Sequence, residues 1–378
     1  MHSDHLRDCQ KKAKRIVVKV GSSTLTNKGK PRTQKFGKLA ESISALIDDD
    51  REVVLVSSGA VAMGSQRLGW DHAGKSIPQK QAAAAVGQIS LVEVYRRRFA
   101  AFDKQVGQVL LTRVGLENRE RFLNARHTLQ ELLKLGTVPI VNENDTVATE
   151  EIRFGDNDNL SATMVNLVGA DLLVILTDVD GLYEEKPVVG RKKPKLIEVV
   201  QHITAEIEAA ATGSDSIFGQ GGMISKLEAA KSAALSGAAT ILCNGRSPDI
   251  LQRIVAGEAV GTLFLPGERI SSRKHWLAFT ARTQGSLVVD AGAARALKEQ
   301  GSSLLPAGIL RVEGRFGIGD PVLCVTEDGH ELARGLPAYS ADEIRRIKQV
   351  PASQISTVLG YSNGDEIIHR DDLVALDN

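Results

Sequence analysis

The feature that most constrains the fold of this chain is a series of short apolar runs, most of which end in small, polar or acidic residues. Ile16–Val20 is followed by Gly21-Ser22-Ser23, and Val53–Val56 is followed by Ser57-Ser58-Gly59-Ala60. Further runs of this kind are Val106–Leu111, Val138–Val141, Leu172–Leu176 and Ala239–Cys243. Continuous apolar runs without polar alternation are typical of strands that are buried on both faces of a parallel sheet.

Helical patterns separate these runs. Phe36, Leu39, Ile43 and Leu46 have the spacing of one face of an amphipathic helix, and Gln79–Phe99 and Glu117–Leu135 also read as helices. The alternation predicts an α/β fold with a mainly parallel sheet between layers of helices. Ligands of such sheets bind outside the carboxyl ends of the strands, where the small and acidic residues of this chain gather.

The pattern changes after about Trp276. Short strands punctuated by turn residues are expected at Leu287–Val289, Ile309–Val312, Val322–Val325 and Glu331–Gly335. They predict a small β-rich barrel after the α/β domain. We therefore expect a polar N-terminal tail (1–14), a catalytic domain (15–270) and a barrel (277–372), which suits a chain of 378 residues.

Composition excludes several classes of protein. A net charge of +1 gives no global sign of nucleic-acid or anionic-membrane binding. The three cysteines, Cys9, Cys243 and Cys324, are far apart and predict neither a disulfide framework nor a zinc site, which favours a reducing, cytoplasmic compartment. We expect no signal peptide and no membrane-spanning segment, because the first residues are polar and no apolar run approaches about 20 residues.

Two turns at strand ends could hold phosphate groups. Gly21-Ser22-Ser23 follows a strand that carries Lys19, and Ser57-Ser58-Gly59 is a second turn of the same kind. Glycine allows the backbone N–H groups to approach a phosphate, and a lysine supplies charge. The alternative is that both turns are tight connections that need small residues. The Walker A and Rossmann patterns are absent.

Two polar clusters follow, Asn142–Asp145 and Gly155–Asn159. Carboxylates at the margin of a core need a cation, a metal or a substrate ammonium group. The spacing does not fit an EF-hand. The alternative is a helix cap, with Asp158 or Asn159 capping a helix that begins near Leu160.

A glycine-rich loop, Gly219–Gly222, leads into an expected helix with Lys226 in its first turn. A lysine there opposes the helix dipole unless an anion binds at that end. The alternative is a flexible loop with a surface lysine. The eight histidines show no metal-ligand spacing, so we expect no residues dedicated to a metal.

Together these stretches resemble the amino-acid kinase family over nearly the whole chain. The resemblance rests on Val18–Ser23, Val56–Ala62, Lys80–Gln88, Arg121–Arg126, Val141–Thr149, Phe154–Asp158, Leu176–Tyr183 and Gly221–Met223. Residues after Trp276, including Gly301–Pro306 and Asp320–Val322, look like a PUA domain.

The resemblance implies ATP- and Mg²⁺-dependent phosphorylation of the side-chain carboxylate of L-glutamate to L-glutamyl 5-phosphate, the first step of proline biosynthesis. It also implies feedback inhibition by proline, a homo-oligomer (tetramer or dimer), and the next enzyme of proline synthesis as a possible partner. The NENDTVAT and GDND stretches carry the choice of glutamate.

Roles carried over from the family fall on matching positions. Lys19 and Lys226 would contact the transferred phosphoryl group, and Asp158 would orient the two lysines. Ser58, Asp145 and Asn157 would bind glutamate. ATP would be held by Lys19, Gly21, Thr177, Asp178, Gln220, Gly221, Gly222, Met223, Ile224, Ser225 and Lys226. Gln220 departs from the threonine that many relatives have there.

Two rival functions remain open. The first is a kinase of the same fold that acts on acetylglutamate, aspartate, carbamate or a nucleoside monophosphate. The second is RNA binding by the PUA domain. Residues 277–378 carry 10 Lys and Arg against 14 Asp and Glu, which argues against RNA binding, although Arg345, Arg346 and Lys348 could form a local basic face.

Overall fold

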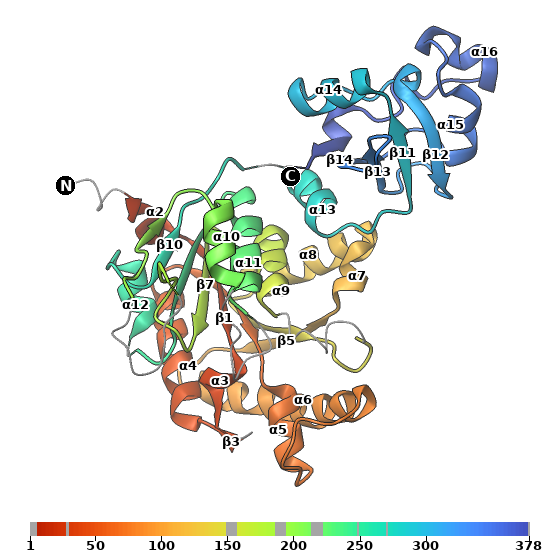
Figure 1. Ribbon diagram of the computed structural model, residues 1–378. Coiled ribbons are helices and arrows are strands. Elements are labelled where there is room, and N and C mark those ends of the chain that lie inside the picture. The colour runs from red at the N-terminus through yellow and green to blue at the C-terminus, as the bar shows by residue number, and fades with distance from the viewer. Residues whose placement is uncertain are drawn as a thin grey trace. The chain divides into compact units, whose positions relative to one another are not determined.

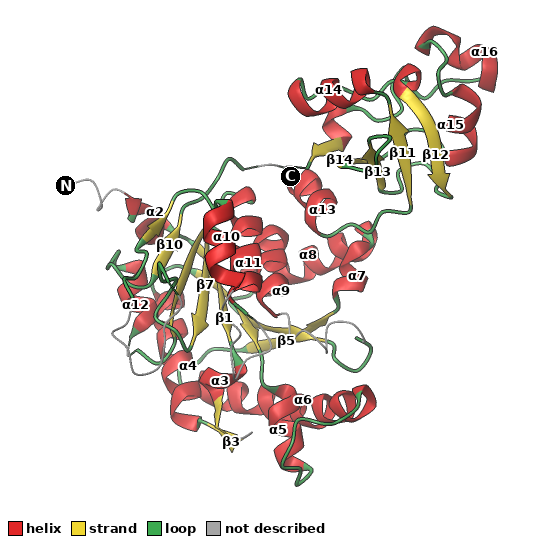
Figure 2. Ribbon diagram, in the orientation of Figure 1, coloured by secondary structure: helices red, strands yellow, loops and turns green. Residues whose placement is uncertain are grey.

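The apolar runs of the sequence form one eight-stranded sheet in the computed structural model (Figures 1 and 2). Its strand order is β5 (Val106–Leu111), β6 (Val138–Glu143), β4 (Glu52–Ser57), β1 (Arg15–Val20), β7 (Leu172–Thr177), β9 (Ala239–Asn244), β10 (Thr262–Phe264) and β8 (Val199–Val200). The first six are parallel, whereas β10 runs antiparallel to β9. The prediction of a mainly parallel sheet is confirmed.

The structure describes residues 6–27, 30–148, 157–185, 194–212, 222–247, 249–269 and 271–376. The chain divides into two units. The first consists of Met1–Gly115 and Glu120–Arg269, and the second of Leu116–Arg119 and Ile270–Asn378. A short helix, α2 (Asp8–Lys12), lies within the segment expected to be a polar tail.

Helices cover both faces of the sheet (Figure 2). The first face carries α4 (Thr33–Asp48), α6 (Ile77–Ala100) and α12 (Ile250–Val255), whose apolar side chains share one core with Val18, Val20 and Leu176. The second face carries α9 (Asn157–Val168) and α11 (Met223–Leu235), which pack on β1, β7 and β9. Because side chains alternate along a strand, Lys19 points to the face of the sheet that α9 covers, whereas Val18 and Val20 point to the face that α4 covers.

The remaining elements of the first unit are shorter or lie outside these layers. They are α3 (Ser22–Leu25), β2 (Thr26–Asn27), β3 (Lys30–Pro31), α5 (Ala60–Arg67), α8 (Arg119–Lys134) and α10 (Ala205–Thr212). The helix α7 (Arg113–Glu117) spans residues of both units, and so does α8 through its first residue, Arg119. The helix predicted over Glu117–Leu135 begins two residues later, as α8.

Two glycines allow α5 and α6 to pack backbone to backbone. A Cβ atom added to Gly64 would lie 1.7 Å from the carbonyl oxygen of Ala83, and one added to Gly87 would lie 1.8 Å from that of Ala60. No side chain fits at either position. This contact fixes the helix that follows the Ser57–Ala60 turn.

The second unit contains a five-stranded sheet. Its order is β12 (Ile309–Gly314), β11 (Gly285–Val289), β13 (Val322–Val325), β14 (Glu331–Gly335) and β15 (Leu373–Ala375), with only β11 and β13 parallel. The other elements are α13 (Ser272–Phe279), α14 (Ala291–Glu299), η2 (Pro306–Gly308), α15 (Ala341–Ile347), η3 (Ala352–Gln354), α16 (Ile355–Leu359) and η4 (Arg370–Asp372). Four strands were predicted; the helices were not.

Within the described part of the chain, no helix combines the length and hydropathy needed to cross a membrane. Cys9, Cys243 and Cys324 are all free thiols, and burial raises the pKa of Cys243 and of Cys324 to about 12.

Candidate active site

The turns that follow the central strands meet at one edge of the sheet. The Gly21 N–H donates to the carbonyl of Leu176 (3.4 Å), and the Ser58 N–H donates to that of Val20 (3.1 Å). Gly59 has φ of +116°, a conformation open to glycine but strained for other residues. The β1, β4 and β7 turns therefore line one edge, where a ligand of a parallel sheet is expected.

Lys19, Asp158 and Lys226 form an ion cluster at this edge. The Nζ atom of Lys19 lies 2.5 Å from Oδ1 of Asp158, and Nζ of Lys226 lies 3.1 Å from Oδ2. All three are buried, with exposed fractions of 7%, 1% and 8%. The cluster joins the end of β1 to the first turns of α9 and α11.

The electrostatics of the cluster favour the charged form of Asp158. Burial would raise the pKa of Asp158, but the two lysines outweigh it and lower that pKa to about 2. Burial lowers the pKa of Lys226, and the carboxylate of Asp158 opposes this shift. Two cations face one anion, so the cluster has an excess positive charge that a phosphoryl group can neutralise.

The N-terminus of α11 lies beside the cluster. Gly222 is its N-cap residue and offers no side-chain cap. The Ser225 hydroxyl lies 3.0 Å from Oδ2 of Asp158 and 2.9 Å from the Gly222 carbonyl. The first N–H groups of a helix bind anions well, and here they are joined to a buried lysine pair.

Asn157, next to Asp158, holds a second polar cluster. Its Nδ2 donates to the Ser58 hydroxyl (2.8 Å) and to Oδ1 of Asn142 (3.0 Å). Asn142 in turn donates to Oε1 of Gln88 (2.9 Å). Within the described part of the chain, Oδ1 of Asn157 and Nε2 of Gln88 are buried and have no hydrogen-bond partner. One acceptor and one donor are thus available to a ligand that carries both an ammonium group and a carboxylate.

Tyr95 forms a hydrogen bond next to this polar cluster. Its hydroxyl lies 2.8 Å from Oγ of Ser57, the last residue of β4. Tyr95 is fully buried, and burial raises the pKa of its phenol. The pair fixes the end of β4, from which Ser58 extends.

Comparisons with known proteins agree with this geometry. A model of the amino acid kinase family matches residues 14–244, and a PUA domain model matches residues 285–359. The chain belongs to the amino acid kinase family. Three similar proteins are named "Glutamate 5-kinase". The one from Geobacter sulfurreducens is 52% identical over 97% of this chain and 98% of its own length. The one from Syntrophotalea carbinolica is 48% identical over 97% of this chain and 99% of its own length. The one from Cupriavidus metallidurans is 50% identical over 96% of this chain and 98% of its own length.

The structure of this amino acid kinase brings most of the expected site residues to one edge. Lys19, Asp158 and Lys226 are in contact, as are Ser58 and Asn157. Other expected residues lie at the ends of elements: Gly21 caps α3, Thr177 ends β7, and Gly222, Met223, Ile224 and Ser225 begin α11. Asp178 contributes to the electrostatics of Lys226 and accepts a hydrogen bond from Thr177 (3.2 Å).

The remaining expected site residues are Asp145, Gln220 and Gly221. Asp145 lies in the turn that follows β6, and its role in the amino acid kinase site stays a prediction. Gln220 and Gly221 lie outside the described residues. The alternative that Asp158 or Asn159 caps a helix beginning near Leu160 does not hold, because α9 begins at Asn157 and both residues lie in its first turn, where the carboxylate of Asp158 faces the lysines.

Sequence reasoning missed the supporting residues. Gln88 and Tyr95 lie about two helical turns apart on the same face of α6, and no motif singles out their side chains by role. A polar residue within an otherwise apolar helix face was the available signal for Gln88. Tyr95 gave none, because a buried tyrosine in a core helix is ordinary.

Proposed function

We propose that this protein is a glutamate 5-kinase, which transfers the γ-phosphoryl group of ATP to the side-chain carboxylate of L-glutamate. The observation that carries the proposal is the buried cluster of Lys19, Asp158 and Lys226 at the carboxyl edge of the sheet. The named relatives, alike over nearly their whole lengths, support the choice of glutamate.

The reaction needs no general base. The side-chain carboxylate of glutamate is already ionised at neutral pH, because its pKa is about 4.3. One carboxylate oxygen attacks the γ-phosphorus, the bond between that phosphorus and the β–γ bridging oxygen breaks, and ADP leaves with the electron pair. The barrier comes from bringing two anions together, so catalysis rests on position and on positive charge.

Lys19 and Lys226 supply that charge. Asp158 holds both ammonium groups on one carboxylate, which sets their positions before substrates bind. We assign the α11 N-terminus, with Thr177 and Asp178, to the nucleotide. The glycine turn at Gly21 would face the transferred phosphoryl group.

Magnesium would enter as MgATP. Both carboxylate oxygens of Asp158 are occupied by lysines, and the part of the chain that the structure describes contains no group of three or more His, Cys, Asp or Glu residues suited to a metal. Mg²⁺ is commonly held by substrate phosphates with few protein ligands. It would neutralise charge on the β- and γ-phosphates.

Glutamate would bind beside Asn157. The unpartnered Oδ1 of Asn157 can accept from the α-ammonium group, and Ser58 can donate to a carboxylate. We assign Asp145 to the same ammonium group, because a substrate with two carboxylates needs an anion in its site to hold the cation. Gln88 offers its free Nε2 to a carboxylate.

The proposal extends to the setting of the enzyme. We infer a catalytic domain over 15–270 and a PUA domain over 277–372, with a cytoplasmic location, a homo-oligomeric state and inhibition by proline. The free cysteines support a reducing compartment. The resemblance to the family supports the other points.

A hydroxylamine trap tests the reaction. The protein is incubated with MgATP, L-glutamate and hydroxylamine, and glutamyl hydroxamate is measured alongside ADP. We expect hydroxamate with glutamate but not with N-acetylglutamate or aspartate. ADP release without hydroxamate would contradict the proposed acceptor, and hydroxamate with aspartate alone would assign another substrate.

A further inference from the structure

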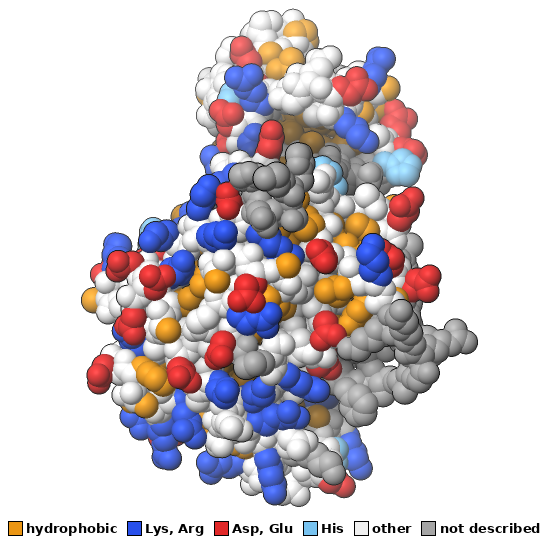
Figure 3. Space-filling view, turned by 90° about the vertical axis from the view of Figure 1, so that its left-hand side faces the viewer, with side chains coloured by type: hydrophobic (Ala, Val, Ile, Leu, Met, Phe, Trp, Pro, Cys, Tyr) orange, Lys and Arg blue, Asp and Glu red, His pale blue; other side chains and the backbone are white. Residues whose placement is uncertain are grey.

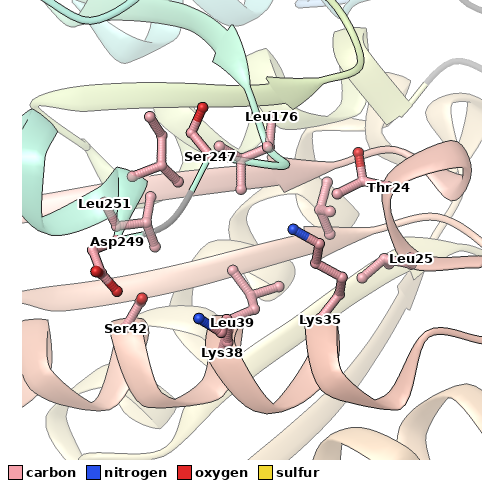
Figure 4. Close-up of a pocket in the computed structure, with 13 residues that line it drawn as sticks. Thr24, Leu25, Lys35, Lys38, Leu39, Ser42, Leu176, Ser247, Asp249 and Leu251 are labelled. Carbon is pink, nitrogen blue, oxygen red and sulfur yellow. The ribbon is translucent and has the colours of Figure 1, made fainter.

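A second pocket lies on the opposite face of the sheet from Lys19. It is formed between α4 and the segment that leads into α12 (Figure 4). Val20 of β1 and Leu176 of β7 line its floor. Its empty space is about 460 Å³, part of which is open to solvent. Because Val20 and Lys19 point to opposite faces of β1, this pocket is distinct from the ion cluster described above.

Cations dominate the rim of this pocket. Lys35 and Lys38 reach it from α4, while Ser247 and Asp249 stand on the opposite wall (Figure 4). Arg32 and Arg246 lie close enough to Lys35 to act on its charge. Figure 3 faces the side of the first unit that carries α4 and α12, and Lys and Arg side chains gather in the lower part of that face.

These cations are not balanced by the protein. Burial lowers the pKa of Lys35, and its cationic neighbours Lys38, Arg32 and Arg246 lower it further. Lys35 donates instead to the backbone carbonyl of Arg246 (2.9 Å). Within the described residues none of the four cations forms an ion pair, and Asp249 is the one carboxylate that lines the pocket. The excess of positive charge is unfavourable until an anion binds.

The floor and one wall add an apolar surface and a free hydroxyl. Leu25, Leu39, Leu176, Ile250 and Leu251 line the pocket together with Val20. Thr24 also lines it; this residue is 3% exposed, and its hydroxyl has no hydrogen-bond partner in the described structure. A buried hydroxyl without a partner is costly, and a ligand oxygen in the pocket could satisfy it.

We propose that the pocket between α4 and α12 is a binding site for a small molecule that carries a phosphate group on an apolar body. The phosphate would lie between Lys35 and Lys38, and the apolar body would pack on the leucine floor. A dianion fits better than a single carboxylate, because two lysines and one aspartate line the pocket, and Arg32 and Arg246 add positive charge near Lys35.

The site is joined to the catalytic edge through α3. Thr24 and Leu25 line the pocket, and the same four-residue helix begins after Gly21, in the turn that follows Lys19. A ligand that contacts Thr24 therefore contacts the helix that carries the catalytic glycine turn. Occupancy would be expected to alter the kinetics of the kinase.

Calorimetric titration of the full-length protein with phenyl phosphate and with inorganic phosphate, in a low-salt buffer without other phosphate, tests the site. We expect phenyl phosphate to bind more tightly than inorganic phosphate, because only it can cover the apolar floor. The double substitution Lys35→Gln, Lys38→Gln should weaken phenyl phosphate binding at least about tenfold, the scale of losing charged hydrogen bonds. Thr24→Val, which removes only the hydroxyl, should weaken it several-fold.

Two further variants distinguish binding in this pocket from a general effect of protein charge and from binding at the catalytic edge. Lys134→Gln with Lys298→Gln removes the same charge at exposed positions elsewhere and should leave affinity unchanged. Lys226→Ala disables the catalytic anion site and should also leave it unchanged. Absence of binding to the unmodified protein, equal loss in both double variants, or loss only in Lys226→Ala would each overturn the proposal.

Discussion

Removing the carboxylate of Asp158 is the perturbation with the largest expected effect on the folded protein. Asp158→Asn keeps the size of the side chain but leaves Lys19 and Lys226 buried without a counter-charge. The Nζ atoms of Lys19 and Lys226 lie 2.5 and 3.1 Å from the carboxylate oxygens of Asp158. At an effective dielectric constant of about 20, each lysine therefore loses a Coulomb attraction of about 5–7 kcal/mol. The asparagine also avoids the cost of burying a carboxylate, which offsets several kcal/mol.

The net loss should match what is typical when one partner of a buried ion pair is removed. We expect the free energy of unfolding to fall by about 3–5 kcal/mol at pH 7. Lys226 should then titrate at lower pH in the folded state than in the unfolded state, because the carboxylate of Asp158 no longer opposes the lowering of its pKa by burial. Because the unfolded state holds more protons, the deficit should shrink as the pH rises from 7 to 9.

Urea unfolding, with hydrogen exchange at the amides of β1 and α9 to isolate the first unit, measures this loss. Asp71→Asn is the matched control, because that side chain is 99% exposed and its loss should change stability by less than about 0.5 kcal/mol. An Asp158→Asn protein as stable as the control, or a deficit that grows with pH, would refute the account of the cluster.

Four other outcomes are expected. Lys226→Ala should lower kcat by about 10²–10³ with a smaller effect on the KM for glutamate, and steady-state kinetics with an unchanged kcat would remove Lys226 from the mechanism. Asp145→Asn should raise the KM for glutamate; a normal KM would end its assignment to the ammonium group. Gly64→Ala should destabilise the protein by about 1–3 kcal/mol or more, because its Cβ meets the Ala83 backbone, whereas Gly37→Ala in α4, where the nearest atom is 3.9 Å away, should not; equal melting temperatures for the two variants would contradict the close packing. Finally, the folded pKa of Asp158, about 2, lies below its ordinary value of 3.8, so acid should favour the unfolded state, and about 2 kcal/mol of stability should be lost as the pH falls from about 4 through 2. Acid unfolding of Asp158→Asn should lack this component, and the same acid slope in both proteins would assign it to other groups.

Most strands of the first unit were predictable because they are largely apolar runs. Burial on both faces leaves a signal that needs no knowledge of neighbours, and Leu172–Leu176 falls within β7 for this reason. By contrast, β8 has two residues and β10 runs antiparallel, and both depend on pairing that periodicity does not record. The helices of the second unit were missed because they are short.

The site was predictable in its parts but not in its geometry. The residues at strand ends marked the edge, and the family resemblance marked Lys19, Asp158 and Lys226. Which atoms meet depends on β1, α9 and α11 converging from distant parts of the chain. The contacts of Tyr95 and the pocket at Lys35 likewise arise only from packing between elements, and no local pattern identifies them.

Transfer of the phosphoryl group to the side-chain carboxylate of glutamate can be followed with an ¹⁸O label in that carboxylate. Glutamate labelled with ¹⁸O in its side-chain carboxylate is incubated with MgATP and hydroxylamine, and the released phosphate is examined by ³¹P NMR. Hydroxylamine attacks the acyl carbon, so the phosphate leaves with the oxygen that joined carbon to phosphorus. The account predicts phosphate carrying one ¹⁸O atom from the side-chain label and none from glutamate labelled in the α-carboxylate. Unlabelled phosphate in the first case, or labelled phosphate in the second, would contradict it.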